Sequence, residues 1–266
     1  MTKRIVITGS TRGIGYGLAD AFLARGCKVM ISGRQQDVVD QAVHTLAEKH
    51  GAERITGHAC DVTEYAQVQA LWNAAASQFG GIDIWINNAG MANILTPFWE
   101  LDPQEMERVV KTNILGTMYG CSVVLREMLK MGSGALYNME GFGSRGGRKL
   151  PGLTLYGTTK AATAFLDDSL IKELEGKPVI FGSISPGMVV TDMLLNQQKG
   201  SNPADWERSR RVFNILADRV ETVTPWLVEQ ILENQKPGAQ IRWLTSAKAT
   251  WRFLSAPFHK RKVIEE

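Results

Sequence analysis

Short apolar runs alternate with longer segments of helical periodicity along the chain. The runs have the length of β-strands, and in the segments between them apolar residues recur every three or four positions. Strands that alternate with helices predict a largely parallel sheet covered on both faces, a doubly wound α/β fold. We expect about seven mostly parallel strands, at 4–8, 28–32, 54–60, 83–86, 135–138, 178–185 and 240–244. The expected helices include 13–26, 37–50, 64–79, 104–131 and 155–175.

A glycine-rich turn, TGSTRGIG from Thr8 to Gly15, joins the first expected strand to the first helix. Glycines let the backbone approach a pyrophosphate, and the helix amino terminus offers unpaired N–H groups. The spacing is G-x-x-x-G-x-G rather than G-x-G-x-x-G, and the alternative is a tight connection without a ligand. Strand, turn and helix predict a Rossmann-type dinucleotide site in a single domain, residues 1–266. The residues expected to bind the cofactor here are Gly9, Ser10, Thr11, Arg12, Gly13, Ile14 and Gly15.

The second strand ends at Arg34, where a site for NAD usually has an acidic residue, about 20 residues after the glycine turn. Arg12 lies inside the turn itself. Two guanidinium groups near the ribose suit a 2′-phosphate, which arginine binds with charge-assisted hydrogen bonds. We therefore expect NADPH as the cofactor. The alternative is a pair of solvated arginines.

Small and polar residues follow the third and fourth strands, at the edge where parallel sheets bind ligands. Asp61 is expected to accept from the adenine amino group, with Val62 beside it, although Asp61 would also serve as a cap for the helix at 64–79. The turn after the fourth strand is also expected to contact the cofactor, unless it is a plain turn. Its residues are Asn88, Ala89 and Gly90.

Tyr156 and Lys160 are spaced so that both project from one face of the helix at 155–175. A nearby ammonium favours the phenolate and would lower the pKa of the tyrosine from about 10. Tyr156 would then exchange a proton in an alcohol–carbonyl interconversion. A buried Asn113 near Tyr156 would bend the helix at 104–131 and hold a water. The alternatives are a solvated lysine beside a partly buried tyrosine, and a surface asparagine.

The 266 residues are 44% hydrophobic and 21% charged, which fits a globular α/β protein with a full core. The net charge of +3 and the scattered basic residues are too mild to indicate nucleic-acid binding. Cys27, Cys60 and Cys121 are isolated, so we expect neither a disulfide framework nor a metal site. The chain runs directly into the first strand and has no apolar run of membrane-spanning length, so we expect a cytoplasmic protein.

Together these motifs resemble those of the short-chain dehydrogenase/reductase family, in the right order and over nearly the whole chain. A further match is the PGMVVT stretch from Pro186 to Thr191. The resemblance implies an NAD(P)-dependent oxidoreductase in which Tyr156 is the acid/base and Lys160 holds the nicotinamide ribose. It also implies that Asn113 anchors a water of a proton relay. The nicotinamide end of the cofactor would be held by Pro186, Gly187, Val189 and Thr191.

One motif departs from the family pattern. The family has Asn-Ile-Ser-Ser at the end of strand five, and its second serine holds the substrate oxygen. This chain has Asn-Met-Glu-Gly up to Gly141, and Gly143 stands at the family's spacing from the tyrosine. We expect Ser144 to take the role through a reshaped loop. The alternative is that Ser144 is a loop residue and the role is vacant.

The sequence around this departure resembles the chlorophyll b reductase branch of the family, as do the stretches at 185–194, 213–217 and 241–245. That branch reduces the 7-formyl group of chlorophyll b to a hydroxymethyl group. We therefore expect an NADPH-dependent reductase of an aldehyde or ketone on a large hydrophobic substrate, with 191–226 as the substrate loop or lid. The alternatives are a non-catalytic NADPH-binding sensor and a reductase of an unrelated hydrophobic compound. Bulky apolar residues expected near the substrate are Met91, Ile94, Phe98, Trp99, Phe142, Met193, Leu194, Leu195, Trp206 and Phe213.

The last segment, 240–266, interleaves aromatic residues such as Trp251 and Phe258 with lysines and arginines. A stretch of this kind contacts a membrane surface peripherally, packs on a partner subunit, or simply covers its own domain. The family resemblance implies a homodimer or homotetramer built from the helices around Asn113 and Phe165.

Overall fold

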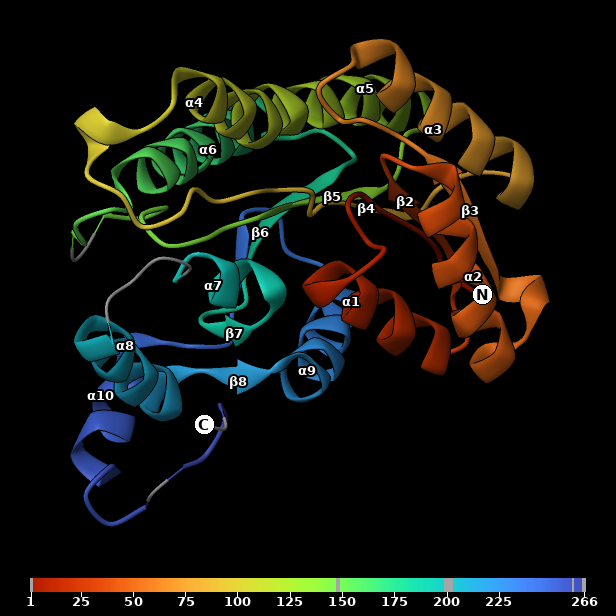
Figure 1. Ribbon diagram of the computed structural model, residues 1–266. Coiled ribbons are helices and arrows are strands. Elements are labelled where there is room, and N and C mark those ends of the chain that lie inside the picture. Colours follow the sequence, from red (N-terminus) through yellow and green to blue (C-terminus); the bar gives the residue numbers. More distant parts are fainter. Residues whose placement is uncertain (1, 147–148, 199–202, 260, 265–266) are drawn as a thin grey trace.

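A seven-stranded parallel sheet forms the centre of the molecule, in the order β3-β2-β1-β4-β5-β6-β9 (Figure 1). The structure is a computed structural model that describes residues 2–146, 149–198, 203–259 and 261–264. The chain order reverses between β1 and β4, and ligands of such sheets bind beyond the carboxyl ends of the strands at this point. The strands are β1 (Arg4–Ile7), β2 (Lys28–Gly33), β3 (Ile55–Ala59), β4 (Ile84–Asn87), β5 (Ala135–Met139), β6 (Ile180–Ser185) and β9 (Ala239–Arg242).

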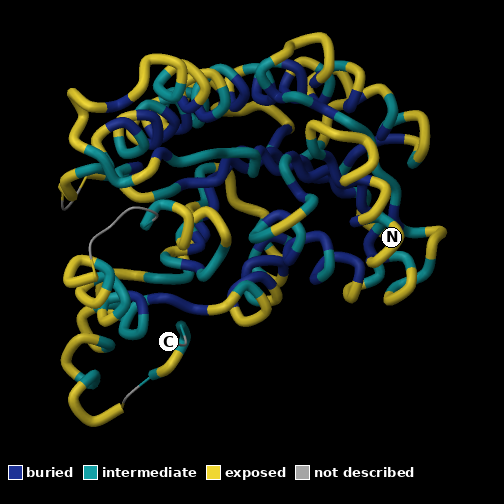
Figure 2. Tube along the Cα trace, viewed as in Figure 1, coloured by how far each residue is buried: buried dark blue, intermediate teal, exposed yellow. Residues whose placement is uncertain are grey.

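Helices cover both faces of the sheet and produce two apolar cores (Figure 1). One face carries α3 (Tyr65–Phe79), α4 (Pro103–Val110), α5 (Gly116–Met131) and α6 (Thr154–Glu173). The other carries α1 (Gly13–Ala24), α2 (Gln36–His50) and α9 (Val220–Glu233). Short 3₁₀ turns lie at Ala52–Arg54 and Phe98–Glu100. The strands between the two layers are largely buried, as parallel strands covered on two faces must be (Figure 2).

The predicted doubly wound fold is confirmed. Each of the seven expected strands is present, with its ends shifted by at most two residues. The expected helix at 104–131 is interrupted, because one π-helical turn, Lys111–Leu115, joins α4 to α5.

A smaller part of the fold lies beyond the sheet, and its two strands were not predicted from the sequence. Two short parallel strands, β7 (Val189–Val190) and β8 (Asp218–Arg219), pair with each other. Around them are α7 (Asp192–Asn196), α8 (Pro203–Leu216) and α10 (Ser246–Ser255), and α8 and α10 lie together at one end of the molecule (Figure 1). The range 191–226 expected as a lid holds α7, α8 and β8, but it also includes the start of α9, which packs on α1.

Three further observations limit the kinds of site in the described part of the chain. Cys27, Cys60 and Cys121 are buried and free. Within the described ranges, no group of three or more metal-ligating side chains is arranged to hold a metal ion. Of the helices formed by these residues, none is long and apolar enough to cross a membrane.

Candidate active site

The glycine turn lies directly against the segment that follows β4. At Gly9, which has a φ of +61°, an added β-carbon would lie 2.7 Å from the α-carbon of Ala89. At Gly15 it would lie 2.4 Å from the side-chain nitrogen of Asn88. That amide donates to the carbonyl oxygens of Thr8 and Gly9 at 2.9 and 2.8 Å. The turn is therefore held at the switch point between β1 and β4.

The amino terminus of α1 is left open by the turn. Ser10 is buried, and its hydroxyl donates to the Ile7 carbonyl at 2.6 Å and accepts the Ser32 N–H at 2.9 Å, so its side chain supports the fold. The Arg12 side chain at the N-cap position makes no capping hydrogen bond to α1. The first N–H groups of the helix, beginning at Gly13 and Ile14, thus form a site that suits a pyrophosphate.

Arg12 and Arg34 are exposed on neighbouring segments of the same edge. Their neighbours touch, because a β-carbon at Gly33 would lie 2.8 Å from the methyl carbon of Thr11. Within the described part of the chain, neither guanidinium has a hydrogen bond or an ion pair. The two charges are therefore available to an anion bound at this edge.

Asp61 and Val62 follow β3, and the Asp61 side chain contacts the turn before α3. One carboxylate oxygen of Asp61 accepts the N–H and the hydroxyl of Thr63, at 3.0 and 2.8 Å. Since α3 begins only at Tyr65, Asp61 caps the preceding turn and not the helix. The side chain of Val62 is buried against Gly116, where a β-carbon would lie 2.7 Å away.

Asn113 is buried in the π-helical turn. Its side-chain oxygen accepts the Met91 N–H at 2.9 Å, and its amide donates to the Met91 carbonyl at 2.8 Å and to the Thr159 hydroxyl at 2.9 Å. Its backbone carbonyl accepts the Thr117 hydroxyl at 2.8 Å. Thr159 lies between Tyr156 and Lys160 in α6, so the structure brings Asn113 to the predicted pair. Turns of this type are frequent at functional sites.

Lys160 is buried one helical turn after Tyr156. Its ammonium donates to the Met139 carbonyl at the end of β5, at 2.8 Å. A β-carbon at Gly90 would lie 3.8 Å from this ammonium and 3.4 Å from the side-chain oxygen of Asn113. The three predicted residues Gly90, Asn113 and Lys160 therefore meet at one point beside the glycine turn.

Burial is the largest influence on the pKa values of Tyr156 and Lys160. It raises the pKa of Tyr156 to about 12, although part of the residue stays exposed. It lowers the pKa of Lys160 to about 8, while the charges of Asp167 and Glu140 oppose this shift. The expected lowering of the tyrosine pKa is therefore wrong for the protein alone, because desolvation is the dominant influence and the ammonium lies 6.0 Å from the ring centre. Near neutral pH Tyr156 is a protonated acid, which suits carbonyl reduction.

Position 141 is the one that faces the tyrosine hydroxyl. A β-carbon at Gly141 would lie 2.3 Å from the hydroxyl oxygen of Tyr156. Gly143 has a φ of +95° and lies against the backbone of α6, so it leaves no room for a serine. Ser144 is buried, and its hydroxyl accepts the Gly141 N–H at 2.9 Å. Ser144 thus supports the backbone at 141, and a glycine stands opposite the tyrosine.

Asp167 is a buried acid near the site that the sequence analysis missed. One of its oxygens accepts from Asn138 at 2.6 Å, and the other has no partner among the described residues. Burial raises its pKa to about 7. Asp167 follows Lys160 by two helical turns on the same face of α6, and this spacing could have indicated it.

Glu140 is a second buried acid that was missed. It accepts from the Ser183 hydroxyl at 3.0 Å and from Arg145 at 2.7 Å, and Arg145 also pairs with Asp168 at 2.7 Å. Glu140 lies between Met139, which binds the Lys160 ammonium, and Gly141. Its contacts therefore fix the backbone on both sides of the site.

The stretch 186–191 leaves β6 at the same edge and returns to the glycine turn. Gly187 has a φ of +73°, and the Leu244 side chain leaves no room for a β-carbon there. The methyl carbon of Thr191 would lie 3.6 Å from a β-carbon at Gly13. The remaining predicted residues of this stretch, Pro186 and Val189, are buried.

Exposed apolar side chains gather on the loops at this edge: Ile94, Phe98, Trp99, Phe142, Met193 and Leu195. The loop after β4 joins α7 through the Leu95 N–H, which donates to the Gln197 carbonyl at 3.0 Å. Trp206 packs on Phe213 in α8, with ring centres 6.3 Å apart. Trp226 and Trp243, by contrast, pack against the main core, so these two tryptophans lie away from the expected substrate entrance.

A parallel sheet with an open helix amino terminus at its switch point, next to a tyrosine and a buried lysine one helical turn apart, is the arrangement of NAD(P)-dependent oxidoreductases. The chain belongs to the short chain dehydrogenase family, whose model matches residues 3–202.

The chain is also similar to several individual proteins. Chlorophyll(ide) b reductase NOL of Arabidopsis thaliana is 38% identical, over 94% of this chain and 72% of that protein. Probable chlorophyll(ide) b reductase NYC1 of the same plant is 32% identical over 91% of this chain, which spans 51% of that protein. A solved structure, ElxO with NADP bound, is 26% identical with a TM-score of 0.77, over 91% of this chain and 97% of that one. These similarities confirm the resemblance predicted from the motifs.

Proposed function

We propose that this protein is an NADPH-dependent reductase of an aldehyde or ketone carried by a large hydrophobic molecule, with the formyl group of chlorophyll b or chlorophyllide b as the model substrate. The observation that carries the proposal is Tyr156 one helical turn before the buried Lys160, at an edge that carries exposed apolar side chains. The named activity of the NOL and NYC1 relatives supports the same substrate class.

The residues at the edge fit a nicotinamide dinucleotide. Gly9 and Gly15 stand where a β-carbon would collide with Ala89 or Asn88, so the backbone of the turn carries no side chain at these points. The N-cap residue Arg12 does not cap the first turn of α1, and its N–H groups are open to a ligand. When bound, the reduced nicotinamide supplies a hydride to the carbonyl carbon. The exposed Arg12 and Arg34 favour NADPH, because a 2′-phosphate would receive two charge-assisted contacts.

In this proposal, the side chains around Tyr156 move and hold protons. Tyr156 donates its hydroxyl proton to the oxygen of the substrate carbonyl. Lys160, anchored on the Met139 carbonyl, holds the ribose and stabilises the phenolate that this donation leaves. Asn113 fixes the Met91 backbone and Thr159, and thereby the distance between α6 and the loop after β4.

The substrate class is proposed from the apolar residues on the surrounding loops. Phe98, Phe142 and Met193 come from three different segments of that edge. Each side chain that packs on a ligand would contribute about 1–3 kcal/mol through burial. A small polar sugar would bury no comparable area, and so a flat or hydrophobic carbonyl compound suits this edge better.

The test is steady-state kinetics with NADPH and chlorophyllide b, beside small aliphatic and polar ketones. We expect conversion of the formyl group to a hydroxymethyl group, with kcat/KM at least about tenfold above that of any polar ketone. Tyr156→Phe should abolish turnover and retain NADPH binding. Higher kcat/KM for a polar compound would contradict the substrate class, and turnover by Tyr156→Phe would contradict the proton donor.

A second candidate is a non-catalytic NADPH-binding sensor. It is favoured by one observation: the residue that faces the Tyr156 hydroxyl is Gly141, and the position at the spacing of the family's second serine is Gly143. Tight NADPH binding without oxidation of NADPH, across a panel of hydrophobic and polar carbonyl compounds, would support the sensor over the reductase.

A further inference from the structure

The last part of the chain is strongly basic. From residue 234 to residue 264 the sequence contains no aspartate or glutamate. The same range contains seven lysines and arginines: Lys236, Arg242, Lys248, Arg252, Lys260, Arg261 and Lys262. The whole chain has a net charge of only +3, so positive charge is concentrated in a segment outside the proposed reductase site.

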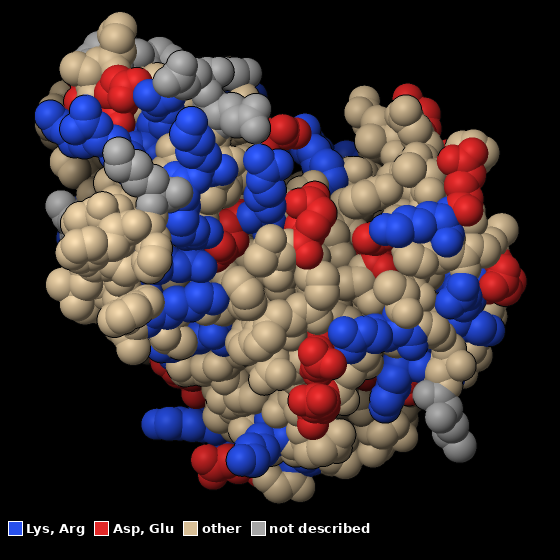
Figure 3. All heavy atoms as spheres, turned by 90° about the horizontal axis from the view of Figure 1, so that it is seen from below, with Lys and Arg blue, Asp and Glu red and all other residues tan. Residues whose placement is uncertain are grey.

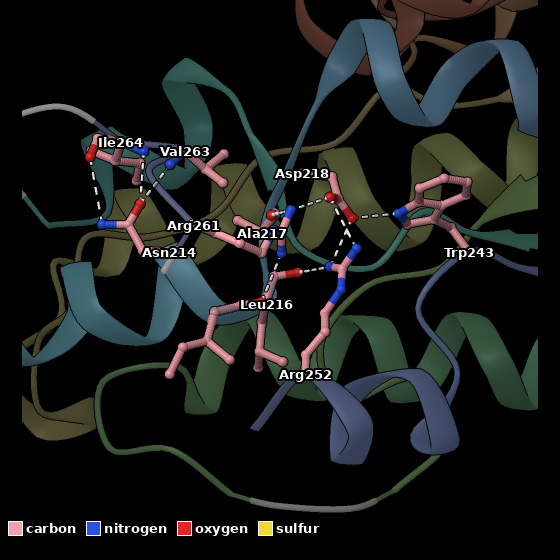
Figure 4. A network of polar contacts seen from close by, with 10 residues as sticks. Asn214, Leu216, Ala217, Asp218, Trp243, Arg252, Arg261, Val263 and Ile264 are labelled. Carbon is pink, nitrogen blue, oxygen red and sulfur yellow. Dashed lines mark hydrogen bonds and ion pairs between the residues drawn. The ribbon is translucent and has the colours of Figure 1, made fainter. Parts of the chain in front are cut away.

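Two of these arginines attach the segment to the lid (Figure 4). Arg252 of α10 contacts both carboxylate oxygens of Asp218, at 3.0 and 2.8 Å, and donates to the Leu216 carbonyl at 2.8 Å. Arg261 donates to the same carboxylate at 2.5 Å, and the Trp243 indole donates to it at 2.6 Å. Asp218 is buried directly after α8, so the two guanidinium groups both neutralise it and cap the carboxyl end of that helix.

With Arg252 turned inward, α10 presents apolar side chains to the outside. Trp251 is 69% exposed, Leu254 is 67% exposed, and Phe258, just after the helix, is 83% exposed. Trp251 and Leu254 are three residues apart and therefore lie on one face of α10. Phe258 follows four residues later and extends this apolar stripe beyond the helix. No described residue buries this stripe, so it is an apolar surface in need of a partner.

Cations lie on the elements around the stripe. Arg211 of α8, Arg242 of β9 and Lys262 are exposed, and the Lys248 ammonium lies 3.3 Å from the centre of the Trp243 ring. Figure 3 shows Lys and Arg side chains in a column on this side of the molecule, beside a projecting area of uncharged residues. Apolar side chains edged with positive charge fit the boundary between the headgroups and the acyl chains of an anionic membrane.

We propose that this tail face, formed by Trp251, Leu254 and Phe258 with Lys248 and Lys262 around them, binds the surface of an anionic lipid bilayer. A second copy of the chain is a poorer partner, because the exposed cations beside the stripe in the two copies would repel each other. A nucleic acid would meet the cations and leave the apolar stripe exposed to water. A bilayer with negative headgroups satisfies both features at once.

The connection through Arg252 determines where the bilayer would lie. Arg252 links α10 to Asp218 at the end of the lid helix α8, far from α2 and α3 on the other side of the molecule (Figure 1). A membrane bound at the tail face is therefore adjacent to the lid. The proposal does not depend on the reductase activity and can be tested without any substrate.

Flotation of the full-length protein with vesicles tests the proposal. We expect the protein to float with vesicles of phosphatidylcholine and phosphatidylglycerol, to float much less with phosphatidylcholine alone, and to be released by high salt. The triple variant Trp251→Glu, Leu254→Glu, Phe258→Glu should bind at least about tenfold more weakly, because it loses apolar contact and adds negative charge. Lys262→Glu alone should cause a smaller loss that disappears at high salt.

The matched control is Val38→Glu, the same kind of change at an exposed apolar residue of α2 on the other side of the molecule, which should leave vesicle binding unchanged. Thermal unfolding of every variant shows whether the fold survives. The proposal is overturned if the wild type does not bind anionic vesicles, or if Val38→Glu weakens binding as much as the triple variant does. It is also overturned if the triple variant changes only the oligomer mass in light scattering, since the tail face would then be a subunit interface.

Discussion

Gly141 and Tyr156 approach each other so closely that a β-carbon on the glycine would lie 2.3 Å from the tyrosine hydroxyl oxygen. The N–H of Gly141 is occupied by the Ser144 hydroxyl, at 2.9 Å. In the proposed reductase, polarisation of the substrate oxygen would therefore rest on Tyr156 itself, and a side chain at position 141 would displace the group that donates the proton.

Gly141→Ala should lower kcat at least about tenfold, because the rigid tyrosine ring must move to accommodate the methyl group. NADPH affinity, measured by fluorescence titration, should change little. Gly157→Ala is the matched control, since an added β-carbon there meets only the Phe142 carbonyl at 4.0 Å. That change should be neutral or stabilise α6 by up to about 1 kcal/mol. Equal rates for both variants would show that position 141 has no influence on Tyr156.

Ser144→Ala should reduce both stability and turnover. It removes the acceptor of the partly buried Gly141 N–H, and the loss of one such hydrogen bond costs about 0.5–1.5 kcal/mol. Urea unfolding and the ratio of kcat to KM would measure the two effects, with Ser144→Thr as a variant that keeps the hydroxyl. A fully active Ser144→Ala enzyme would mean that this hydroxyl does not position the site.

Arg34→Ala should weaken NADPH binding and leave NADH binding unchanged. Loss of one charge-assisted contact to a 2′-phosphate is worth about 1.5–3 kcal/mol. Calorimetric titration with each cofactor would measure the difference. Arg25→Ala, at the opposite end of α1 from Arg12, removes an exposed arginine without touching the cofactor edge. An equal loss for NADPH and NADH would refute the assignment of Arg34 to the 2′-phosphate.

The stability of Asp167→Asn, measured relative to wild type, should increase from pH 4 to pH 8. Burial raises the pKa of Asp167 to about 7 in the folded state, above about 3.9 for the unfolded chain. Its stabilising contribution is therefore fully present below pH 4 and is lost as the pH rises through 7. Asparagine carries no charge and avoids this loss, which is on the order of 4 kcal/mol because the two pKa values differ by about three units and each unit is about 1.4 kcal/mol.

Thermal unfolding of both proteins from pH 4 to pH 8 would show the effect as a gap that widens with pH. Asp168→Asn, at the neighbouring exposed acid, provides the control. A constant gap between Asp167→Asn and wild type would mean that Asp167 does not titrate in this range.

The local parts of the fold and site could be predicted because their signals are local in the sequence. The glycine turn needs residues without side chains within one short stretch, and Gly9 and Gly15 meet the segment after β4 as a dinucleotide turn should. The seven strands were visible as apolar runs for the same reason. The π-helical turn was predicted only in part. Asn113 indicated a bend, but the spacing of apolar residues does not reveal that one extra residue is inserted in the helix.

Features that depend on distant contacts escaped prediction. Strands β7 and β8 have two residues each, too few for a periodic pattern. The partners of Asp218 are Trp243, Arg252 and Arg261, which follow it by 25 to 43 residues. A local sequence pattern cannot predict contacts over such separations. The pKa of Tyr156 was predicted in the wrong direction because helical spacing gives the approach of Lys160 but not the burial of the phenol.

The π-helical turn at Lys111–Leu115 also has a consequence for changes of chain length. A π-helical turn accommodates one extra residue within a helix, so deleting one residue from Lys111–Leu115 would restore an uninterrupted α-helix with α4 and α5 in nearly the same orientation. The packing of Val109 on Leu155 of α6 would then survive, but the bulged backbone that carries Asn113 to Thr159 of α6 would be lost. A point substitution at Asn113 removes one side chain from the site, whereas a single-residue deletion removes the backbone bulge that carries it.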